Sequence, residues 1–335
     1  MIESNYHFTP LKGYENFEAT TQIIIAEILK RNLPLEIIDA DNNLISVKYK
    51  GREFVIHEGT VSDANSLISY KISDDKWMTK LFLKREGISC AKGVLLKRGY
   101  LKKQINGIEY PVVVKPLDTD HGIGVQTDIG EESDLIKAVD YALNFSKGVI
   151  VEQYCEGREY RFMVIDSKVR AVAYRLPANV CGDGIKTVEQ LVDIKNRGRG
   201  ADYRHPLLKI VIDDEVKRHL AQQGYTPLSV PYKGETLYLR KNSNLSTGGD
   251  SVDVTDDINS FYCDVAVRAA KSAGLRIAGV DIIIKDEKSI PCDDNYIVIE
   301  LNAPAMLSMH NYPYFGKNRN IGKYVLDTIL SSKKV

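Results

Sequence analysis

Two apolar runs toward the C-terminal end of the chain each carry one acidic residue, and they constrain the fold more than any other feature. The run over 277–285 contains Asp281 among valine and isoleucines, and the run over 296–301 contains Glu300. A carboxylate inside a buried strand costs several kcal/mol unless it is paired or bound to a metal. The sequence therefore predicts two adjacent buried strands whose acids have a partner.

Asn302 follows Glu300 by two residues, so both side chains point to the same face of their strand. Two carboxylates and a carboxamide are hard oxygen ligands that suit Mg²⁺ bridging nucleotide phosphates. The alternative is a structural ion pair between each acid and an arginine. Arg161 and Arg175 alternate with apolar residues on two other predicted strands. They suit recognition of a carboxylate or a transferring phosphoryl group, or else pairing with the two acids, which would exclude the metal site.

A second candidate site lies in residues 111–125. Three consecutive valines predict a buried strand, Lys115 stands at the strand's end, and a polar loop with Gly122 and Gly124 follows. Glycines let backbone N–H groups approach a polyphosphate, and a lysine offers a mobile positive charge to its oxygens. The stretch predicts a phosphate cradle, with an ordinary turn between a strand and a helix as the alternative.

The run over 149–154 reads as an apolar strand that ends in Glu152, Gln153 and Tyr154. The backbone of this segment could lie against a flat purine edge, and Glu159 could accept a hydrogen bond from a ribose hydroxyl. The alternative is a strand that merely ends in polar residues.

Residues 246–249, Ser-Thr-Gly-Gly, offer hydroxyl groups and open backbone amides, as an oxyanion-binding turn would. A flexible surface turn is the alternative. A separate stretch over 197–205 holds three arginines, among them Arg199, and one histidine, with no aromatic residue beyond Tyr203. We interpret that stretch as a solvated or mobile loop rather than a nucleic-acid patch.

Length, charge and cysteine usage limit the class of protein. The length of 335 residues indicates two or three domains. Basic and acidic residues both number 45, so no net field recruits nucleic acid or an anionic membrane. Five scattered cysteines without a C-x-x-C pair indicate reduced thiols. No leader and no run near the roughly 20 apolar residues of a membrane span occurs, so we expect a soluble, cytoplasmic protein.

Motifs of several enzyme classes are absent. The sequence has no G-x-x-x-x-G-K-[ST] motif and no G-x-G-x-x-G that opens a helix, which excludes a P-loop and leaves a nicotinamide-binding fold unsupported. Neither G-x-S-x-G nor H-E-x-x-H occurs.

The order of elements favours α+β layers over a repeated βαβ wind. A small leading domain combines a helix over 17–32 with short strands, and Ser73 begins a second helix with Trp77, Leu81 and Phe82 on its inner face. Later strands are predicted over 112–115, 148–153, 159–166, 169–175, 277–285 and 296–301, and later helices over 131–147 and 257–274.

In their order along the chain, these candidates resemble the ATP-grasp carboxylate–amine ligases. A closer likeness is to the ATP-grasp half of the fused bacterial glutamate–cysteine ligase/glutathione synthetase, with cyanophycin synthetase more distant. The likeness runs from about residue 15 to the C-terminus. It rests on the segments Glu159-Tyr160-Arg161-Phe162, Arg175-Leu176-Pro177-Ala178-Asn179-Val180 with the following Cys-Gly-Asp-Gly, 242–256 with its Ser-Thr-Gly-Gly-Asp, and Met309-His310.

The resemblance implies an ATP-grasp fold of the α+β / α/β class, with the nucleotide held between two α+β subdomains. It implies an N-terminal α/β domain over 1–72, a small ATP-grasp subdomain with the glycine loop over 73–155, and a large subdomain with the metal and substrate site over 156–335.

The resemblance also implies a role for each candidate residue. The implied nucleotide-binding residues are Lys76, Lys115, His121, Gly122, Gly124, Glu152, Gln153, Tyr154 and Glu159. The implied metal ligands are Asp281, Glu300 and Asn302, and the implied catalytic residues are Arg161 and Arg175. The implied substrate-binding residues are Asn244, Ser246, Thr247, Gly248 and Gly249.

The activity implied by the resemblance is that of an ATP-dependent, ADP-forming peptide ligase that works through an acylphosphate. ATP and two Mg²⁺ ions are the implied cofactors, with Mn²⁺ as a substitute. The partners are a small-molecule carboxylate and amine, with γ-glutamylcysteine and glycine as the first pair. No nucleic acid or membrane is expected, and a homo-oligomer is compatible with the family. The alternatives are a stand-alone ligase of a specialised peptide or natural product, and a nucleotide-binding regulatory protein without turnover.

Two departures from the family pattern bear on the substrates. The fused enzyme has a separate N-terminal glutamate–cysteine ligase module, which this sequence lacks, so we expect another enzyme to supply any γ-glutamyl dipeptide. In the segment 300–306, Pro304 stands one residue earlier than in the family pattern, which leaves the identity of the substrate open.

Overall fold

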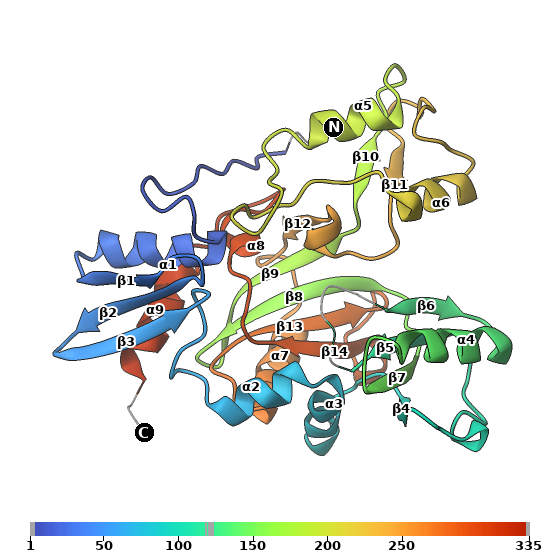
Figure 1. Ribbon diagram of the computed structural model, residues 1–335, viewed down its shortest axis with the longest axis horizontal. Helices are drawn as coiled ribbons and strands as arrows, with labels where there is room; N and C mark the ends of the chain where they lie inside the picture. Colours follow the sequence, from blue (N-terminus) through green and yellow to red (C-terminus); the bar gives the residue numbers. More distant parts are fainter. Residues whose placement is uncertain (1–3, 118, 120–123, 333–335) are drawn as a thin grey trace. The chain divides into compact units, whose positions relative to one another are not determined.

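The computed structural model describes residues 4–117, 119 and 124–332. The chain divides into two compact units, each assembled from separate stretches of the chain, and Figure 1 labels their helices and strands. The first unit comprises Met1–Ala64, Arg170–Ile258 and Pro304–Val335, and the second comprises Asn65–Val169 and Asn259–Ala303. The mixture of sheets and helices confirms the predicted α+β class. The three domains expected over 1–72, 73–155 and 156–335 stay a prediction.

The N-terminal part of the first unit combines one helix with a three-stranded antiparallel sheet. These elements are α1 (Ala19–Lys30), β1 (Leu35–Asp39), β2 (Leu44–Tyr49) and β3 (Arg52–His57), with the strands in sequence order. Helix α9 (Gly322–Ser331) comes from the other end of the chain and packs against α1. Arg31, just after α1, pairs with Asp327 of α9 at 2.6 Å. The two ends of the chain are therefore joined within this unit.

The remainder of the first unit contains short strands and helices. They are β9 (Lys168–Leu176), β10 (Asn179–Cys181), α5 (Val188–Lys195), α6 (Asp214–Gln222), β11 (Thr236–Tyr238), the 3-10 helix η2 (Leu245–Thr247), β12 (Asp250–Asp253) and α8 (Ser308–Asn311). Strand β9 pairs antiparallel with β12, and β10 pairs antiparallel with β11. Helices α5 and α6 contribute valines and a leucine to a buried core that they share with β10 and β11.

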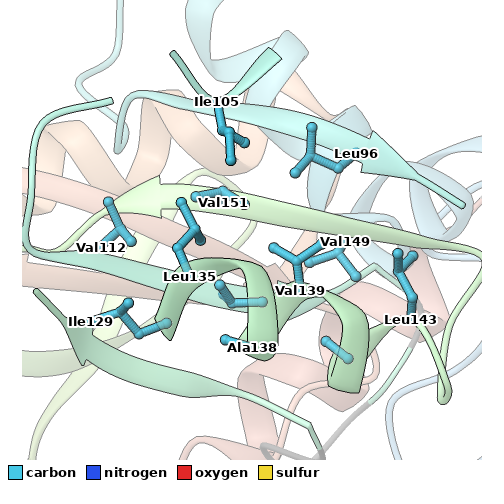
Figure 2. Close-up of a cluster of buried hydrophobic side chains, with 12 residues drawn as sticks. Leu96, Ile105, Val112, Ile129, Leu135, Ala138, Val139, Leu143, Val149 and Val151 are labelled. Atoms are coloured by element: carbon cyan, nitrogen blue, oxygen red, sulfur yellow. The ribbon is translucent and has the colours of Figure 1, made fainter. Parts of the chain in front are cut away.

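The second unit contains a four-stranded antiparallel sheet in the order β4-β7-β5-β6. Its elements are β4 (Gly93–Lys97), the 3-10 helix η1 (Lys102–Gln104), β5 (Val112–Pro116), β6 (Gln126–Ile129), α4 (Glu132–Ala142) and β7 (Gly148–Gln153). Figure 2 shows α4 packed on this sheet through a cluster of buried aliphatic side chains. Leu135, Ala138 and Val139 recur at helical spacing, and they meet alternate valines of β5 and β7.

The alternation of the strands determines which residues face away from α4. Val112 and Val114 of β5 belong to the α4 core, so Lys115 points to the opposite face of the sheet. In β7, Val149 and Val151 belong to the same core, so Glu152 also points to the opposite face.

Three further strands of this unit are neighbours in the order β8-β13-β14, and they pair antiparallel within a larger sheet. The strands are β8 (Arg158–Ile165), β13 (Ile277–Ile284) and β14 (Tyr296–Asn302), and the helices nearby are α2 (Leu67–Asp74), α3 (Lys76–Arg85), α7 (Ser260–Ser272) and the 3-10 helix η3 (Asp293–Asn295). Helix α7 packs against all three strands. The two acid-bearing runs are therefore adjacent strands, as predicted.

Two helix predictions were wrong. Ser73 lies inside α2, and α3 begins after Asp75, whose carboxylate caps the amides of Trp77 and Met78 at 2.8 Å each. Leu81 is 45% exposed rather than on the inner face, which is formed by Thr79, Lys80 and Leu83. The helix predicted over 131–147 ends at Ala142, because the chain turns there and packs Phe145 back on Tyr141.

The other predicted strands and helices match the structure to within about three residues at each end. All five cysteines are free thiols, as predicted. In the described part of the chain, no helix is long and apolar enough to cross a membrane.

Candidate active site

Three charged residues form one row across β8, β13 and β14 in the second unit. The register pairs Asp281 with Arg161 on one side and with Glu300 on the other. The register of β13 with β14 shifts just after this row, where Asp281 opposes Glu300 and Ile282 opposes Val298, so Ile299 is an extra residue. Such bulges are common beside active sites, and this one keeps Glu300 on the same face as Asp281.

Arg161 pairs with Asp281 through two parallel hydrogen bonds. Its Nε donates to Oδ1 and its Nη2 donates to Oδ2 at 2.7 Å, and both side chains are buried. Burial would lower the pKa of Arg161, but the Asp281 carboxylate outweighs it and raises that pKa. The arginine pair that the sequence left open as an alternative is thus present for Asp281. Glu300 lies 4.0 Å from the same guanidinium.

Gly279 makes room for this ion pair. A Cβ atom at Gly279 would lie 2.8 Å from Cδ of Arg161, which is closer than real Cβ contacts. The Arg161 side chain therefore crosses directly over the Gly279 backbone, two residues before Asp281 on the same face of β13.

We call Asp281 and Glu300, the two acids of this row, the acid row. Its oxygen atoms and its negative charge suit a divalent cation. Burial and repulsion from Asp281 raise the pKa of Glu300, and Arg161 offsets this only in part. Each carboxylate oxygen has a second lone pair, so Asp281 can bind a cation while it accepts the hydrogen bonds of Arg161. Asn302 donates its Nδ2 to Oδ2 of Asp281 at 3.5 Å. A cation between the two acids would relieve their repulsion.

The described residues contain no cluster of three or more Asp, Glu, His or Cys side chains that could hold a metal. A cation at the acid row would therefore take Asn302 or oxygens of a bound ligand to complete its coordination.

Lys115 and Glu152 meet on the sheet face that points away from α4. Nζ of Lys115 lies 3.3 Å from Oε1 of Glu152. The other oxygen of Glu152 accepts a hydrogen bond from Nζ of Lys80 at 2.9 Å. Sequence reasoning missed Lys80 and assigned Glu152 to a purine edge, whereas both oxygens of Glu152 contact lysines.

The pKa shifts of this pair follow from its mutual charge. Burial would raise the pKa of Glu152, but Lys115 and Lys80 outweigh burial and lower it. Burial would lower the pKa of Lys115, but Glu152, Glu300 and Glu159 outweigh burial and raise it. Lys115 is therefore cationic, and its charge interacts with Glu152 and with Glu300 of the acid row.

Lys76 contacts the loop that follows β5. It is the first residue of α3, and its Nζ donates to the carbonyl of Thr119 at 2.7 Å. Gly124, at the end of the loop, has φ of +73°, and a Cβ atom there would lie 2.8 Å from Cγ of Pro116. The predicted residues His121 and Gly122 lie outside the residues that the structure describes.

Gln153 and Tyr154 line a cavity of about 440 Å³ in the second unit, together with Cys155, Lys285 and Tyr296. The amide of Gln153 donates to the carbonyl of Lys92, and the amide of Tyr154 donates to that of Pro111, at 2.9 Å each. Neither N–H group is therefore available to a purine edge, and the next amide in the cavity lining is that of Cys155. Glu159 lies two residues before Arg161, on the same face of β8.

The predicted oxyanion turn belongs to the first unit, and three of its amides already have partners. The amides of Thr247 and Gly249 donate to the carbonyl of Asn244, and the amide of Gly248 donates to that of Leu245, at 3.1 to 3.2 Å. Gly248 has φ of +94°, and a Cβ there would lie 2.5 Å from Cγ1 of Ile210. The glycines are thus required for close packing rather than for open amides.

Arg175 and the Asn244 side chain are joined in the same unit. Nη2 of Arg175 donates to Oδ1 of Asn244 at 2.6 Å, and its Nε donates to the carbonyl of Ser243 at 3.4 Å. Ser246 is half-buried in η2 beside them. The structure thereby brings Arg175 together with the predicted substrate turn.

The interpretation of Arg199 as part of a solvated loop was wrong. Its side chain is 1% exposed, and its Nη2 pairs with the buried Asp250. Its Nη1 donates to the carbonyls of Gly248 and Gly249 at 3.1 and 3.4 Å. Lys195 also pairs with Asp250 at 2.6 Å. The network supports the turn from within, because the carboxylate of Asp250 sets the position of the arginine.

Comparisons with known proteins agree with this architecture. A family model described as the D-ala D-ala ligase C-terminus matches residues 83–218, and one described as an ATP-grasp-like domain matches residues 15–68. The crystal structure of a bifunctional glutathione synthetase from Pasteurella multocida is 34% identical with a TM-score of 0.75, covering 96% of this chain and 45% of that one. A D-alanine–D-alanine ligase from Bacillus anthracis shares the fold alone, with 15% identity, a TM-score of 0.50 and coverage of 80% and 69%. The chain is therefore similar to ATP-grasp proteins in both sequence and fold.

Two bacterial glutathione biosynthesis proteins are similar to this chain along most of its length. The glutathione biosynthesis bifunctional protein of Clostridium perfringens is 36% identical over 331 residues, and that of Desulfotalea psychrophila is 34% identical over 328 residues. These alignments cover 96% and 95% of this chain but 42% of each relative. The likeness stated from the sequence is confirmed, and the chain spans less than half the length of these relatives.

Proposed function

We propose that this chain is an ATP-dependent, ADP-forming ligase that joins a carboxylate to an amine, of the glutathione synthetase type. The first substrate pair we propose is γ-glutamylcysteine and glycine. The free thiols support a cytoplasmic location.

The observation that carries the proposal is the acid row together with Lys115 in one compact unit. Burial lowers the pKa of Lys115, but Glu152 and Glu300 outweigh burial and raise it, so the proposed phosphate-binding cation is coupled electrostatically to one of the proposed metal ligands. Phosphoryl transfer requires positioned cations around the phosphates more than covalent help from the protein. The site has that composition.

The nucleotide would be held by residues of the second unit. Lys115 and Lys76 would contact the phosphates, Gln153 to Cys155 would line the nucleobase cavity, and Glu159 would accept from the ribose. Asp281, Glu300 and Asn302 would hold Mg²⁺, in our proposal two ions, with Mn²⁺ as a substitute. Bound there, the metal would neutralise charge on the transferred phosphoryl group.

The proposed reaction has two steps. A carboxylate oxygen of the acid attacks the γ-phosphorus, the bond to ADP breaks, and an acylphosphate forms. The amine nitrogen then attacks the acyl carbon, inorganic phosphate leaves, and the nitrogen loses a proton. Arg161, which is held by Asp281, would position the substrate carboxylate.

The test is ADP release by the purified chain across a matrix of amino acids and γ-glutamyl dipeptides, with mass spectrometry of the products. We expect ADP release to rise when an acid and an amine are both present, with one peptide formed per ADP. Release that no pair stimulates would contradict the ligase.

One observation favours a second candidate, a nucleotide-binding protein without turnover. Arg161 already neutralises much of the charge of Asp281, which weakens the case for a metal. ATP binding without stimulated ADP release would support this candidate. Ligation of a pair other than γ-glutamylcysteine and glycine would instead support a ligase of a specialised peptide.

A further inference from the structure

We propose that Lys80 is a positioning residue for the phosphate-binding site, which it serves by holding one oxygen of Glu152 away from Lys115. This inference rests on the proposed nucleotide site but not on ligation. Lys80 contacts the cavity lining only through the backbone carbonyl of Ala91, and none of its interactions described here is with Arg161, Asp281 or Glu300. Its effect would pass through the carboxylate that it shares with Lys115.

The placement of Lys80 follows from helix α3. Lys76 and Lys80 are four residues apart, so they lie on one face of the helix. Asp75 caps the first turn and fixes where that face points. Lys76 reaches the carbonyl of Thr119, whereas Lys80 reaches the carbonyl of Ala91 at 2.6 Å and Oε2 of Glu152 at 2.9 Å. One helix thereby supports both the loop and the lysine of the sheet.

Burial makes the Lys80 contact strong. The side chains of Lys80 and Glu152 are each 5% exposed. Charged groups in such surroundings are screened weakly, and a charged hydrogen bond there is worth about twice a neutral one. Thr79, Lys80 and Leu83 form the buried face of α3. An apolar side chain would be the usual choice at the position of Lys80.

Charge counting gives Lys80 a role in nucleotide affinity. Two lysines and one glutamate leave the cluster with a net charge of one positive unit, on the sheet face that carries Lys115. Without Lys80 the cluster would be a neutral pair, and Glu152 could turn both oxygens toward Lys115. The Lys115 ammonium would then be drawn toward the sheet and would offer less charge to a phosphate.

The test compares the affinities of the full chain for ATP and for adenosine, measured by calorimetry. For Lys80→Met we expect ATP affinity to fall roughly tenfold or more, as for loss of a charged contact, and adenosine affinity to change less than about twofold. A merely structural role would weaken both ligands alike. Lys80→Arg should restore most of the ATP affinity.

Lys84→Met is the matched control, because it removes the same charge from an exposed position one turn further along α3. ATP affinity for this variant should stay within about twofold of the unchanged chain. An equal loss for Lys84→Met and Lys80→Met would overturn the proposal, since the effect would then be one of overall helix charge.

The Glu152→Gln background shows whether Lys80 acts through Glu152. In that background Lys80→Met should cost much less ATP affinity than it does alone, because the carboxylate that it holds is gone. An undiminished loss would overturn the proposal. Binding of ATP by a chain that ligates no pair of substrates would contradict the proposed function and leave this inference standing.

Discussion

The guanidinium of Arg161 reaches Asp281 by crossing the backbone of Gly279, so this ion pair depends on a residue that has no side chain. Breaking a buried pair by displacing one partner leaves an uncompensated charge. The room at Gly279 is thus as important for the acid row as the charges themselves.

Gly279→Ala tests that room. We expect it to lower the free energy of unfolding by about 1 to 3 kcal/mol, as overpacking does, and to reduce ADP release because Arg161 shifts. Gly130→Ala is the control, since a Cβ there meets nothing within 4 Å. Denaturant unfolding measures both variants, and equal stability for the two would refute the packing role of Gly279.

Asp281→Asn tests the role of the acid row in catalysis. The substitution keeps the shape of the side chain and removes its charge, so both a metal and Arg161 lose their partner. We expect stimulated ADP release to fall about a hundredfold or more. ADP release that stays at the level of the unchanged chain would rule out the metal assignment at Asp281.

Charged residues in buried positions limit what sequence can predict at this scale. Asp281 and Glu300 were found because each interrupts an apolar strand. Lys80 is one of several basic residues along its helix and Arg199 is one of three arginines in its loop, and nothing local separates a buried cation from an exposed one. Their burial is decided by acids that lie 72 and 51 residues further along the chain.

Helix α4 is the element that holds the sheet of Lys115 and Glu152 in place, from the opposite face (Figure 2). Its apolar residues alternate with charged ones at helical spacing, which is why the sequence predicted it. The length was overestimated because Leu143 and Phe145 continue the apolar composition past the last helical turn.

Leu135→Ala tests the contribution of this core. Leu135 is fully buried, so we expect the free energy of unfolding to fall by about 2 to 5 kcal/mol, from lost burial and the cavity left behind. Lys137→Ala, at a 75% exposed side chain of the same helix, should change it by less than about 0.5 kcal/mol. Chemical denaturation compares the two, and a loss for Leu135→Ala as small as that of the control would contradict the described core.

The success of element prediction depended on where apolar residues face. Strand β7 was predicted over its full length because buried valines and an isoleucine run between Gly148 and a polar end. Helix α2 was missed because Leu67 and Ile68 are 75% and 65% exposed, so its apolar residues do not mark its buried face. Side-chain direction in such short helices is set by tertiary packing, which local spacing does not carry.

At the scale of the whole molecule, the first unit is assembled from three separate stretches and depends on ionic contacts between them. Arg319, which precedes α9, donates to both oxygens of Asp253 on β12, at 2.6 to 2.9 Å. Burial would raise the pKa of Asp253, but Arg319, Thr255 and the amide of Lys317 outweigh burial and lower it.

This pKa shift predicts how stability depends on pH. Because the pKa of Asp253 is lower in the folded chain, its stabilisation is fully present above the unfolded value of about 3.9 and is lost as pH falls through the folded value. Asp253→Asn should therefore be less stable than the unchanged chain at pH 6, with the difference shrinking toward about pH 3. Thermal unfolding across this range measures it, and a difference that grows on acidification would refute the shift.

At this scale we propose that one compact unit activates a carboxylate with ATP. The acid row, Lys115 and the nucleobase cavity all belong to that unit, and the family comparison agrees with such a site. The identity of the acid and the amine depends on residues whose family pattern is shared only in part, such as Pro304, so the sequence could not fix it.

Transfer of ¹⁸O from a labelled substrate carboxylate tests the central proposal most directly. The acid that best stimulates ADP release is labelled in its carboxylate, and the inorganic phosphate formed during ligation is analysed by mass spectrometry. An acylphosphate mechanism places one labelled oxygen in each phosphate, because the carboxylate oxygen that attacked phosphorus leaves with it. Phosphate without label, or label recovered in AMP, would contradict the account.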